Sequence, residues 1–332
     1  MRWAPFHNRR LLLAGLMLAV SVAVIVIWWR FETDMQKARA RVATDSTVVQ
    51  TRCGPIEYQE KGTGTPLLSI HGSGGGFDQG MAFAGELSRH GIRVIAMSRF
   101  GYLRTPLPEN ASAEAQADAH ACLLDALGIE RAAILGGSAG APSALQMAIR
   151  RPERVSALIL LVPLTYKPPS VAGSAKPTPA WIENIMMRAL GSDFLFWSAS
   201  HVVREQMIGA VLATPPELLT SASPTERARI NAMLDDIVPV SARAAGLRSD
   251  TAASKHLTPA ALETIIAPTL IISARDDAYG TFASAQYTAS RVPGARFVGF
   301  EQGGHTWVGH NDAVIAEILK LLVIERPRGR AQ

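Results

Sequence analysis

The sequence is short of cysteine and of charge. Only two of its 332 residues are cysteine, and 18% are charged. Two cysteines cannot build a framework of several disulfides. Because Cys53 lies near a predicted hairpin turn and Cys122 inside a helical pattern, we expect both to be unpaired. A share of 48% hydrophobic residues with so little charge excludes a disordered chain. The length is sufficient for one large domain or two small ones.

Clusters of basic residues are also missing from the central part of the sequence. The net charge is +5, but the excess lies in residues 1–30 and in residues 325–332, which we interpret as a basic tail. A nucleic-acid-binding protein needs lysine and arginine gathered on the fold itself. We therefore expect no nucleic-acid partner. The sequence also has no internal repeat and no low-complexity segment.

One long hydrophobic run stands near the N-terminus. Residues 11–29 contain no charge, and as a helix they measure about 28 Å against a hydrocarbon core of about 30 Å. Two arginines precede the run, and Trp28, Trp29 and Arg30 close it in the manner of an interfacial belt. We predict that residues 1–30 form a membrane anchor. A cleaved signal peptide is the alternative, although no A-x-A site directly follows the run.

The orientation of this anchor does not follow from charge, because the positive residues on its two sides nearly balance. A short basic tail before a first apolar run is typical of export signals, so we expect the globular part on the extracytoplasmic side. Residues 31–46 are charged and contain no apolar face worth burying. We predict that they form a stalk between the membrane and the folded domain.

From residue 47 onward, short apolar segments alternate with segments of helical periodicity. The predicted strands are 47–51, 56–59, 66–70, 92–97, 132–135, 155–162, 268–273 and 296–300. The predicted helices of the same part are 77–90, 111–127, 141–151 and 312–324. The first two strands form an antiparallel entry to the sheet. The alternation predicts an α/β fold in which a mostly parallel sheet carries helices on both faces, with residues 47–162 and 264–324 as its core.

The alternation stops between residues 163 and 263. Helical runs at 180–190, 194–211 and 224–238 are separated by prolines, and the segment holds large side chains such as Trp181 and Trp197. Taken singly, such residues are typical of ordinary packing between helices. As a group inserted before the late strands, they predict a helical cap that acts as a lid.

A pentapeptide of the form G-x-S-x-G occupies residues 136–140, between a predicted strand and a predicted helix. Small residues allow a sharp and strained turn that exposes the hydroxyl of Ser138. The free N–H of Ala139 and the dipole of the following helix favour negative charge beside it. This is the geometry of a nucleophile. The alternative is a glycine-rich turn with an incidental serine.

A serine nucleophile needs a base to take its proton and a carboxylate to orient that base. His305 follows the last predicted strand in a tight turn of small residues, whereas His310, at the start of the final helix, is the competing candidate. Asp276 and Asp277 both follow the strand at 268–273. The order along the chain is then Ser, Asp, His.

The run HGSGGG at residues 71–76 exposes several backbone N–H groups directly after a strand. Such a loop binds a phosphate or an oxyanion. It lacks both the Lys-Ser/Thr of a P-loop and the G-x-G-x-x-G spacing of a dinucleotide site, which favours an oxyanion hole formed by the N–H groups of Ser73 and Ala139. His305, His310 and Glu301 do not form a convincing set of metal ligands. We expect neither a metal nor a cofactor.

Together these motifs resemble the α/β-hydrolase superfamily, in the branch with a helical cap, over about residues 47–324. The roles implied by the resemblance are nucleophile for Ser138, acid for Asp277, base for His305 and oxyanion donors for Ser73 and Ala139. The family places its acid three residues after a small residue at the strand end. Counting from Ala274 gives Asp277, whereas counting from Ser273 gives Asp276.

The serine implies acyl transfer to water, since relatives that open epoxides or remove halide have an aspartate there. We expect a carboxylesterase acting on a small, fairly apolar acyl substrate. Carbon–carbon bond hydrolases and proline-directed aminopeptidases share the layout, and a catalytically silent receptor on the same fold is a further alternative. One segment departs from the family: the pattern D-x-R-G-x-G-x-S is replaced by SRFGYLRT at residues 98–105.

Overall fold

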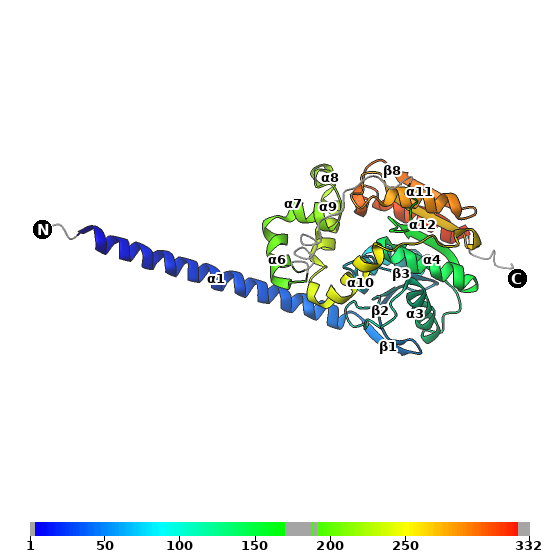
Figure 1. Ribbon diagram of the computed structural model, residues 1–332, viewed down its shortest axis with the longest axis horizontal. Helices are drawn as coiled ribbons and strands as arrows, with labels where there is room; N and C mark the ends of the chain where they lie inside the picture. The colour runs from blue at the N-terminus through cyan, green and yellow to red at the C-terminus, as the bar shows by residue number, and fades with distance from the viewer. Residues whose placement is uncertain (1–3, 170–187, 189–190, 325–332) are drawn as a thin grey trace.

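The computed structural model describes residues 4–169, 188 and 191–324. A long helix, α1 (Ala4–Thr44), projects from a body built around one sheet (Figure 1). The basic tail at 325–332, the residue Trp181 and, apart from Arg188, the predicted helix at 180–190 lie outside the described residues.

The sheet has eight strands in the order β1-β2-β4-β3-β5-β6-β7-β8. Their bounds are β1 (Thr47–Thr51), β2 (Gly54–Lys61), β3 (Thr65–Ile70), β4 (Ile92–Met97), β5 (Ala132–Gly137), β6 (Val155–Leu161), β7 (Thr269–Ala274) and β8 (Arg296–Phe300). β1 pairs antiparallel with β2, and β2 pairs antiparallel with β4. The six strands β4, β3, β5, β6, β7 and β8 are parallel to one another. The mostly parallel sheet with an antiparallel entry is therefore confirmed.

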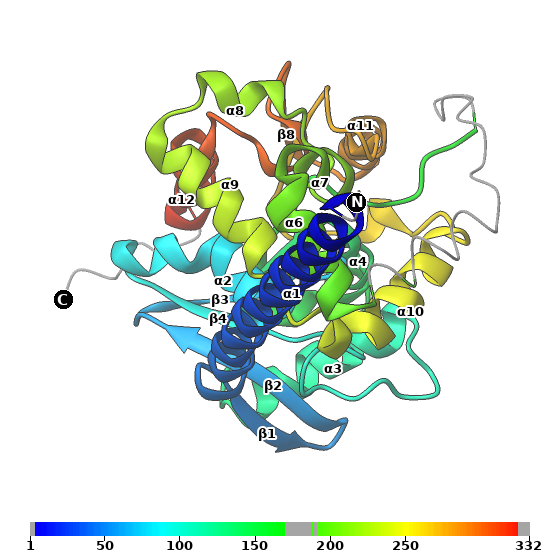
Figure 2. The same cartoon turned by 90° about the vertical axis from the view of Figure 1, so that its left-hand side faces the viewer.

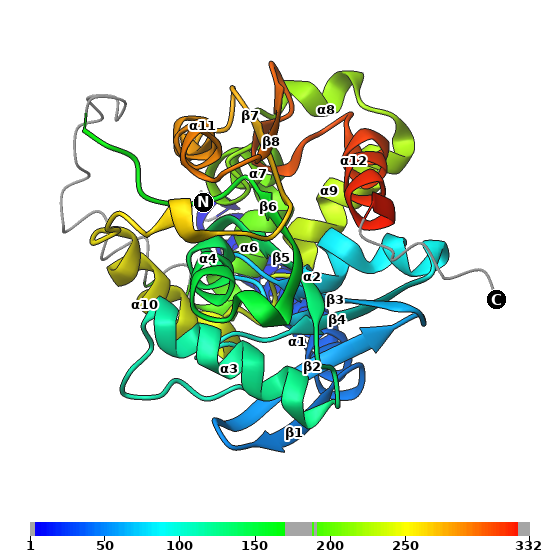
Figure 3. The ribbon, with the colours of Figure 1, turned by 90° about the vertical axis from the view of Figure 1, so that its right-hand side faces the viewer.

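Helices cover both faces of the sheet, because its central strands are apolar on both sides. The covering helices are α2 (Phe77–Ala84), α3 (Ala113–Ala126), α4 (Ala141–Arg150), α11 (Thr281–Arg291) and α12 (Asn311–Ile324). α3, α4 and α11 pack on one face, and α2 and α12 on the other (Figure 3). The predicted helix at 77–90 continues as a 3₁₀ turn from Gly85 to His90, because glycine disfavours continuation of the α-helix.

Between β6 and β7 the described part of the chain, named the cap here, is mostly helical and has a small core of its own. The helices are α6 (Asp193–Val202), α7 (Arg204–Val211), α8 (Glu217–Ser221), α9 (Pro224–Asp235) and α10 (Ala244–Ser254). Phe196, Ile208 and Ile230 pack together in this core. The predicted run at 194–211 is two helices, since the chain turns at the β-branched Val203.

The last turns of α1 are not a bare stalk, so the prediction that residues 31–46 have no face to bury is wrong. Phe31, Met35 and Ala38 are buried, and the first two pack against Trp197 of the cap helix α6. Asp34 accepts a hydrogen bond of 3.1 Å from the indole N–H of Trp197. The three apolar residues recur at helical spacing among charged neighbours. Trp197 therefore holds α1 against the cap.

A partly buried group of ion pairs joins the same end of α1 to the core and the cap. The Asp78 carboxylate of α2 lies 2.8 Å from the guanidinium of Arg41 and 2.6 Å from that of Arg243. Arg41 also donates to the carbonyl oxygens of Asp236 and Val238. Burial by itself would raise the pKa of Asp78, but the two arginines outweigh it and hold the pKa below its ordinary value. The position of α1 relative to the body is thus fixed by charge as well as by packing.

The two cysteines are joined in a disulfide, so the prediction that both are unpaired is wrong. Cys53 lies in the turn between β1 and β2, and Cys122 lies on α3, with their Cα atoms 6.0 Å apart. The strand pair packs over α3 and brings them together across 69 residues of sequence. Their proximity depends on tertiary packing, which the local patterns around each cysteine do not contain.

Candidate active site

Ser138 occupies a strained turn directly after β5. Its φ of 48° lies in the left-handed region, which is costly for a residue with a side chain. The neighbouring glycines leave no room for larger residues: a Cβ on Gly140 would lie 2.5 Å from the carbonyl oxygen of His71, and one on Gly136 would lie 2.7 Å from the Cβ of Ala144. The pentapeptide therefore folds as the sharp turn that its small residues predict.

His305 is held by the carboxylate of Asp277. Its Nδ1 lies 2.8 Å from Oδ2 of Asp277, whose side chain is fully buried, while the His305 side chain is 12% exposed. The Asp277 carboxylate also accepts hydrogen bonds from the backbone N–H of Tyr279, at 2.9 Å, and from the hydroxyl of Thr281. With Nδ1–H donating to the carboxylate, Nε2 is the nitrogen left to accept a proton.

Asp276 holds the loop that carries this histidine. Its two carboxylate oxygens accept from the backbone N–H of Gly303, at 3.1 Å, and of Gly304, at 2.8 Å. The adjacent acids therefore face different partners: Asp277 contacts the imidazole and Asp276 the backbone beside it. His310 stacks on Phe300, with ring centroids 4.0 Å apart.

The serine and histidine turns lie at the same edge of the sheet, because the carboxyl ends of parallel strands meet there. The ring of Phe83 links them, since it contacts Trp307 with centroids 5.7 Å apart and fills the space where Gly137 would carry a side chain. Gly72 packs against the serine, as a Cβ there would lie 2.9 Å from the Cβ of Ser138. The structure thus brings together the turns that carry the predicted nucleophile, base and oxyanion donors.

His71 fixes the start of the glycine-rich loop. Its ring is buried, with Nδ1 2.6 Å from the carbonyl oxygen of Gly72 and Nε2 2.9 Å from the backbone N–H of Arg99. Burial and the nearby Arg99 charge lower the pKa of His71 well below its ordinary value. The imidazole is therefore neutral, and it donates to the carbonyl and accepts from the N–H.

A cap residue that the sequence analysis did not identify, Asp250 of α10, bonds to the glycine-rich loop. Its carboxylate pairs with the guanidinium of Arg99 at 2.5 and 2.9 Å and accepts from the hydroxyls of Tyr102, at 2.5 Å, and Ser73, at 3.0 Å. The Tyr102 hydroxyl in turn accepts from the N–H of Gly74. Burial and the Asp250 charge raise the pKa of Tyr102 well above its ordinary value. The cap and the loop thus form one hydrogen-bonded unit.

Two of these partners, Arg99 and Tyr102, belong to the segment 98–105 that departs from the family pattern. Ser98 stands where the pattern has an aspartate, and its hydroxyl donates to the buried carboxylate of Glu57 at 2.8 Å. Glu57 also accepts from the backbone N–H and the guanidinium of Arg104. The carboxylate of Glu57, on β2, thus binds both Ser98 and Arg104 of this segment. The sequence around Glu57 does not indicate these contacts, because the segment lies more than 40 residues away.

The glycine-rich loop offers fewer free donors than its composition indicates. The N–H of Gly72 donates to the side-chain oxygen of Gln79 at 2.8 Å, and the N–H of Gly74 donates to Tyr102. A phosphate site needs several converging N–H groups, so these bonds argue against the phosphate-binding alternative. Among residues 4–169, 188 and 191–324, no group of three or more histidine, cysteine or acidic side chains is placed to hold a metal ion.

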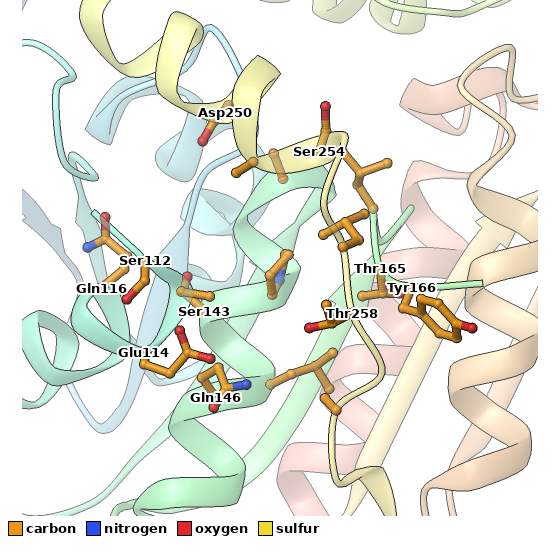
Figure 4. Close-up of a pocket in the computed structure, with 18 of the residues that line it drawn as sticks. Ser112, Glu114, Gln116, Ser143, Gln146, Thr165, Tyr166, Asp250, Ser254 and Thr258 are labelled. Atoms are coloured by element: carbon orange, nitrogen blue, oxygen red, sulfur yellow. The ribbon is translucent and has the colours of Figure 1, made fainter. Parts of the chain in front are cut away.

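A cavity of about 270 Å³ lies beside the serine turn, between α4, α10 and the segment after β6. It reaches Ala139, whereas Ser138 and His305 are not among the residues that line it. Polar side chains from several elements surround it, and Figure 4 shows Glu114, Ser143 and Gln146 gathered on the side of α3 and α4. The cavity is therefore suited to a part of a ligand that does not itself react.

Because two histidines are buried, we expect the free energy of unfolding to fall in mild acid. Nε2 of His120 lies 3.0 Å from the hydroxyl of Ser143, and burial, together with the Arg99 charge, lowers the pKa of His120 to about 3. Below about pH 6.5 the unfolded chain protonates this histidine and His71, whereas the folded chain does not. Stability is thus fully present above that pH and is lost as the pH falls, by about 1.4 kcal/mol per pH unit for each histidine.

Guanidinium unfolding at a series of pH values checks this expectation. The matched variant His120→Gln keeps a hydrogen-bonding side chain that does not titrate, so its stability should fall less steeply between about pH 6.5 and 5. An unchanged slope would contradict a neutral His120 in the folded state.

Among parallel α/β folds, a strained serine turn between a strand and a helix is typical of hydrolases. A family model described as the alpha/beta hydrolase fold matches residues 65–308. The chain belongs to the α/β-hydrolase fold family.

Three similar proteins illustrate this membership. The 2-hydroxymuconate semialdehyde hydrolase of Pseudomonas putida is 40% identical over 117 residues, which cover 34% of this chain and 42% of that protein. An alpha/beta hydrolase fold protein from Nakamurella multipartita superposes with a TM-score of 0.65 at 26% identity, covering 83% of this chain and 98% of the other. A membrane phospholipase A, described as a bacterial virulence factor, has a TM-score of 0.61 at 22% identity and covers 96% and 99%. The last likeness shows the fold alone.

Proposed function

We propose that the protein is a membrane-anchored serine hydrolase that cleaves carboxylic esters through an acyl-enzyme. The observation that carries the proposal is the His305–Asp277 pair, held at the same sheet edge as the strained Ser138. A histidine fixed by a buried carboxylate has the geometry of a general base.

In this mechanism Oγ of Ser138 attacks the ester carbonyl and Nε2 of His305 takes its proton. The buried Asp277 stabilises the resulting imidazolium, and the N–H groups of Ser73 and Ala139 stabilise the oxyanion. The intermediate collapses, and the alcohol leaves with the proton from His305. Water then attacks the acyl-enzyme and gives a proton to His305. His305 returns this proton to Oγ of Ser138 as the acid is released, which restores the serine.

The cavity beside Ala139 is consistent with a substrate that has an apolar acyl group at one end and a polar group at the other. We propose a small, fairly apolar acyl group on Ser138, with a polar group of the ester reaching towards Gln146 and Glu114. Polar contacts fix the orientation of a ligand, whereas apolar burial supplies most of its affinity.

Carbon–carbon bond hydrolysis is the second candidate, because two similar proteins are named as a semialdehyde hydrolase and a dienoate hydrolase. The alignments cover only 42% and 40% of those proteins, so their substrates do not transfer directly. The same serine, histidine and aspartate serve either reaction, and the substrate decides between them.

The anchor belongs to the proposal. Helix α1 is long and apolar enough to cross a membrane by length and composition, and its most apolar window is not buried in the body. The Cys53–Cys122 disulfide supports a catalytic domain on the extracytoplasmic side, since disulfides persist in oxidising compartments.

A substrate screen on the full-length protein in detergent tests the proposal. We expect hydrolysis of p-nitrophenyl esters of graded chain length, and covalent labelling of Ser138 by a fluorophosphonate. Dienoate substrates should be cleaved at least about a hundredfold less efficiently in kcat/KM, a difference of about 2.7 kcal/mol in transition-state binding. Cleavage of dienoates alone favours the second candidate, and no labelling favours a silent receptor.

A further inference from the structure

The cap helix α6 and the residue that follows it, Val203, expose apolar side chains. The exposed fractions are 38% for Phe194, 52% for Leu195, 81% for Val202 and 41% for Val203. Leu195 and Val202 are two helical turns apart and therefore share a face. Exposed apolar side chains gathered on one element are typical of a contact with another protein or with a membrane.

This surface, formed by residues 194, 195, 202 and 203 and named here the α6 face, is continuous with the apolar part of α1. The ring centroid of Phe194 lies 6.3 Å from that of Trp28 and 5.2 Å from that of Phe31. Trp28 closes the uncharged run at 11–29, where tryptophan is typical of the boundary between membrane and water. Phe194 therefore lies at the level where α1 would leave the bilayer.

The arrangement of the helices places α6 near the same end of α1. α6 lies at the end of the body from which α1 projects (Figure 1), and the view onto that end shows α6 beside α1 (Figure 2). Trp197 and Asp34, with the ion pairs of Arg41, hold α1 in this position. The body is thus attached with α6 towards the membrane.

We propose that the α6 face lies in the interfacial layer of the lipid bilayer, so that the cap takes its esters from the membrane. The proposal rests on the membrane anchor of the proposed function and adds a second contact with the lipid. We choose lipid as the partner of the α6 face because this face adjoins the uncharged run at 11–29, which would itself lie in the hydrocarbon of the bilayer. Apolar side chains of an interfacial helix enter the boundary between headgroups and acyl chains.

Site-directed fluorescence on the full chain in phosphatidylcholine vesicles tests the contact. Because Cys53 and Cys122 are joined, Val202→Cys supplies a single thiol for an environment-sensitive dye. The matched control is Ile266→Cys, which is 77% exposed and precedes β7, at the opposite end of the strands from the serine turn. A nitroxide-labelled lipid should quench the dye at 202 at least about threefold more than the dye at 266.

Equal quenching at the two positions would overturn the proposal. A dye at 202 that reports an apolar environment but is not quenched by the lipid would also overturn it, because a second copy of the chain would then cover the α6 face. This measurement does not need enzymatic activity, so it stands if the proposed ester hydrolysis fails.

A second experiment compares hydrolysis of an ester dissolved in vesicles with hydrolysis of a soluble ester. Leu195→Glu and Val202→Glu should lower hydrolysis of a fluorescent ester dissolved in the vesicles by about fivefold or more, because burial of their side chains is lost. Hydrolysis of the soluble p-nitrophenyl butyrate should stay within about twofold, which also shows that the variants fold. Ile266→Glu should change neither rate. An equal loss on both esters would count against a membrane role.

Discussion

Replacing Ser138 by alanine should lower turnover of an acyl ester by about four to six orders of magnitude. The loss is this large because, in the proposed mechanism, Oγ of Ser138 is the atom that forms the acyl bond, so the remaining groups could only assist direct attack by water. Ester kinetics and fluorophosphonate labelling measure it. Alanine meets the same left-handed backbone as serine, so the thermal midpoint should stay within a few degrees.

Ser73→Ala is the matched control for this variant. The proposed role of Ser73 uses its backbone N–H, which alanine keeps, whereas its hydroxyl bonds only to Asp250 among the described contacts. We expect a loss of about tenfold or less, as for one exposed hydrogen bond to a charged group. If Ser138→Ala retained more than about one hundredth of the activity, the acyl-enzyme at this residue would be ruled out.

The parts of the site that follow local patterns were predictable from sequence. The turn at Ser138 depends on glycines that stand beside it, and a Cβ on Gly136 or Gly140 would collide with neighbours. His305 follows from a turn of small residues after the last strand. The alternation of short apolar segments with helical segments likewise predicts the parallel sheet. Strands of such a sheet are buried on both faces and are therefore apolar throughout.

The contacts that depend on distant residues were not predictable in the same way. Asp250 meets Arg99 across 151 residues. It is the one acidic residue of α10, but the helix pattern around it does not indicate which distant residue it pairs with. The disulfide depends on how one hairpin packs over α3. Met35 was missed for another reason: it lies on a narrow apolar face among charges, which a count of composition hides.

The segment 98–105, which departs from the family pattern, makes several of these long-range contacts. Ser98 donates to the carboxylate of Glu57, and Arg99 and Tyr102 bind the cap through Asp250. The same segment that weakens the family pattern thus holds the glycine-rich loop. Binding alone would not require the Asp277 carboxylate to hold His305 at the same sheet edge as this loop. The arrangement therefore favours an enzyme over a catalytically silent receptor.

The two neighbouring acids permit the sharpest test of the site. Asp277→Asn should lower turnover by up to about four orders of magnitude, because an amide at the position 2.8 Å from Nδ1 holds the wrong imidazole tautomer towards Ser138. Asp276→Asn should cost about tenfold or less in turnover. It should instead lower stability by about 1 to 3 kcal/mol, since its carboxylate accepts two backbone N–H groups of the histidine loop.

Both variants are measured on one soluble ester and by thermal unfolding, so that each acid is judged by activity and stability together. Asparagine has nearly the shape of aspartate, which leaves hydrogen bonding and charge as the difference. The geometry predicts opposite profiles: Asp277→Asn loses turnover with a smaller change in stability, and Asp276→Asn loses stability while it keeps most of its turnover. If Asp276→Asn were the inactive variant and Asp277→Asn remained active, the proton would be handled through the other carboxylate, and the distance of 2.8 Å to His305 would describe a resting arrangement that the reaction does not use.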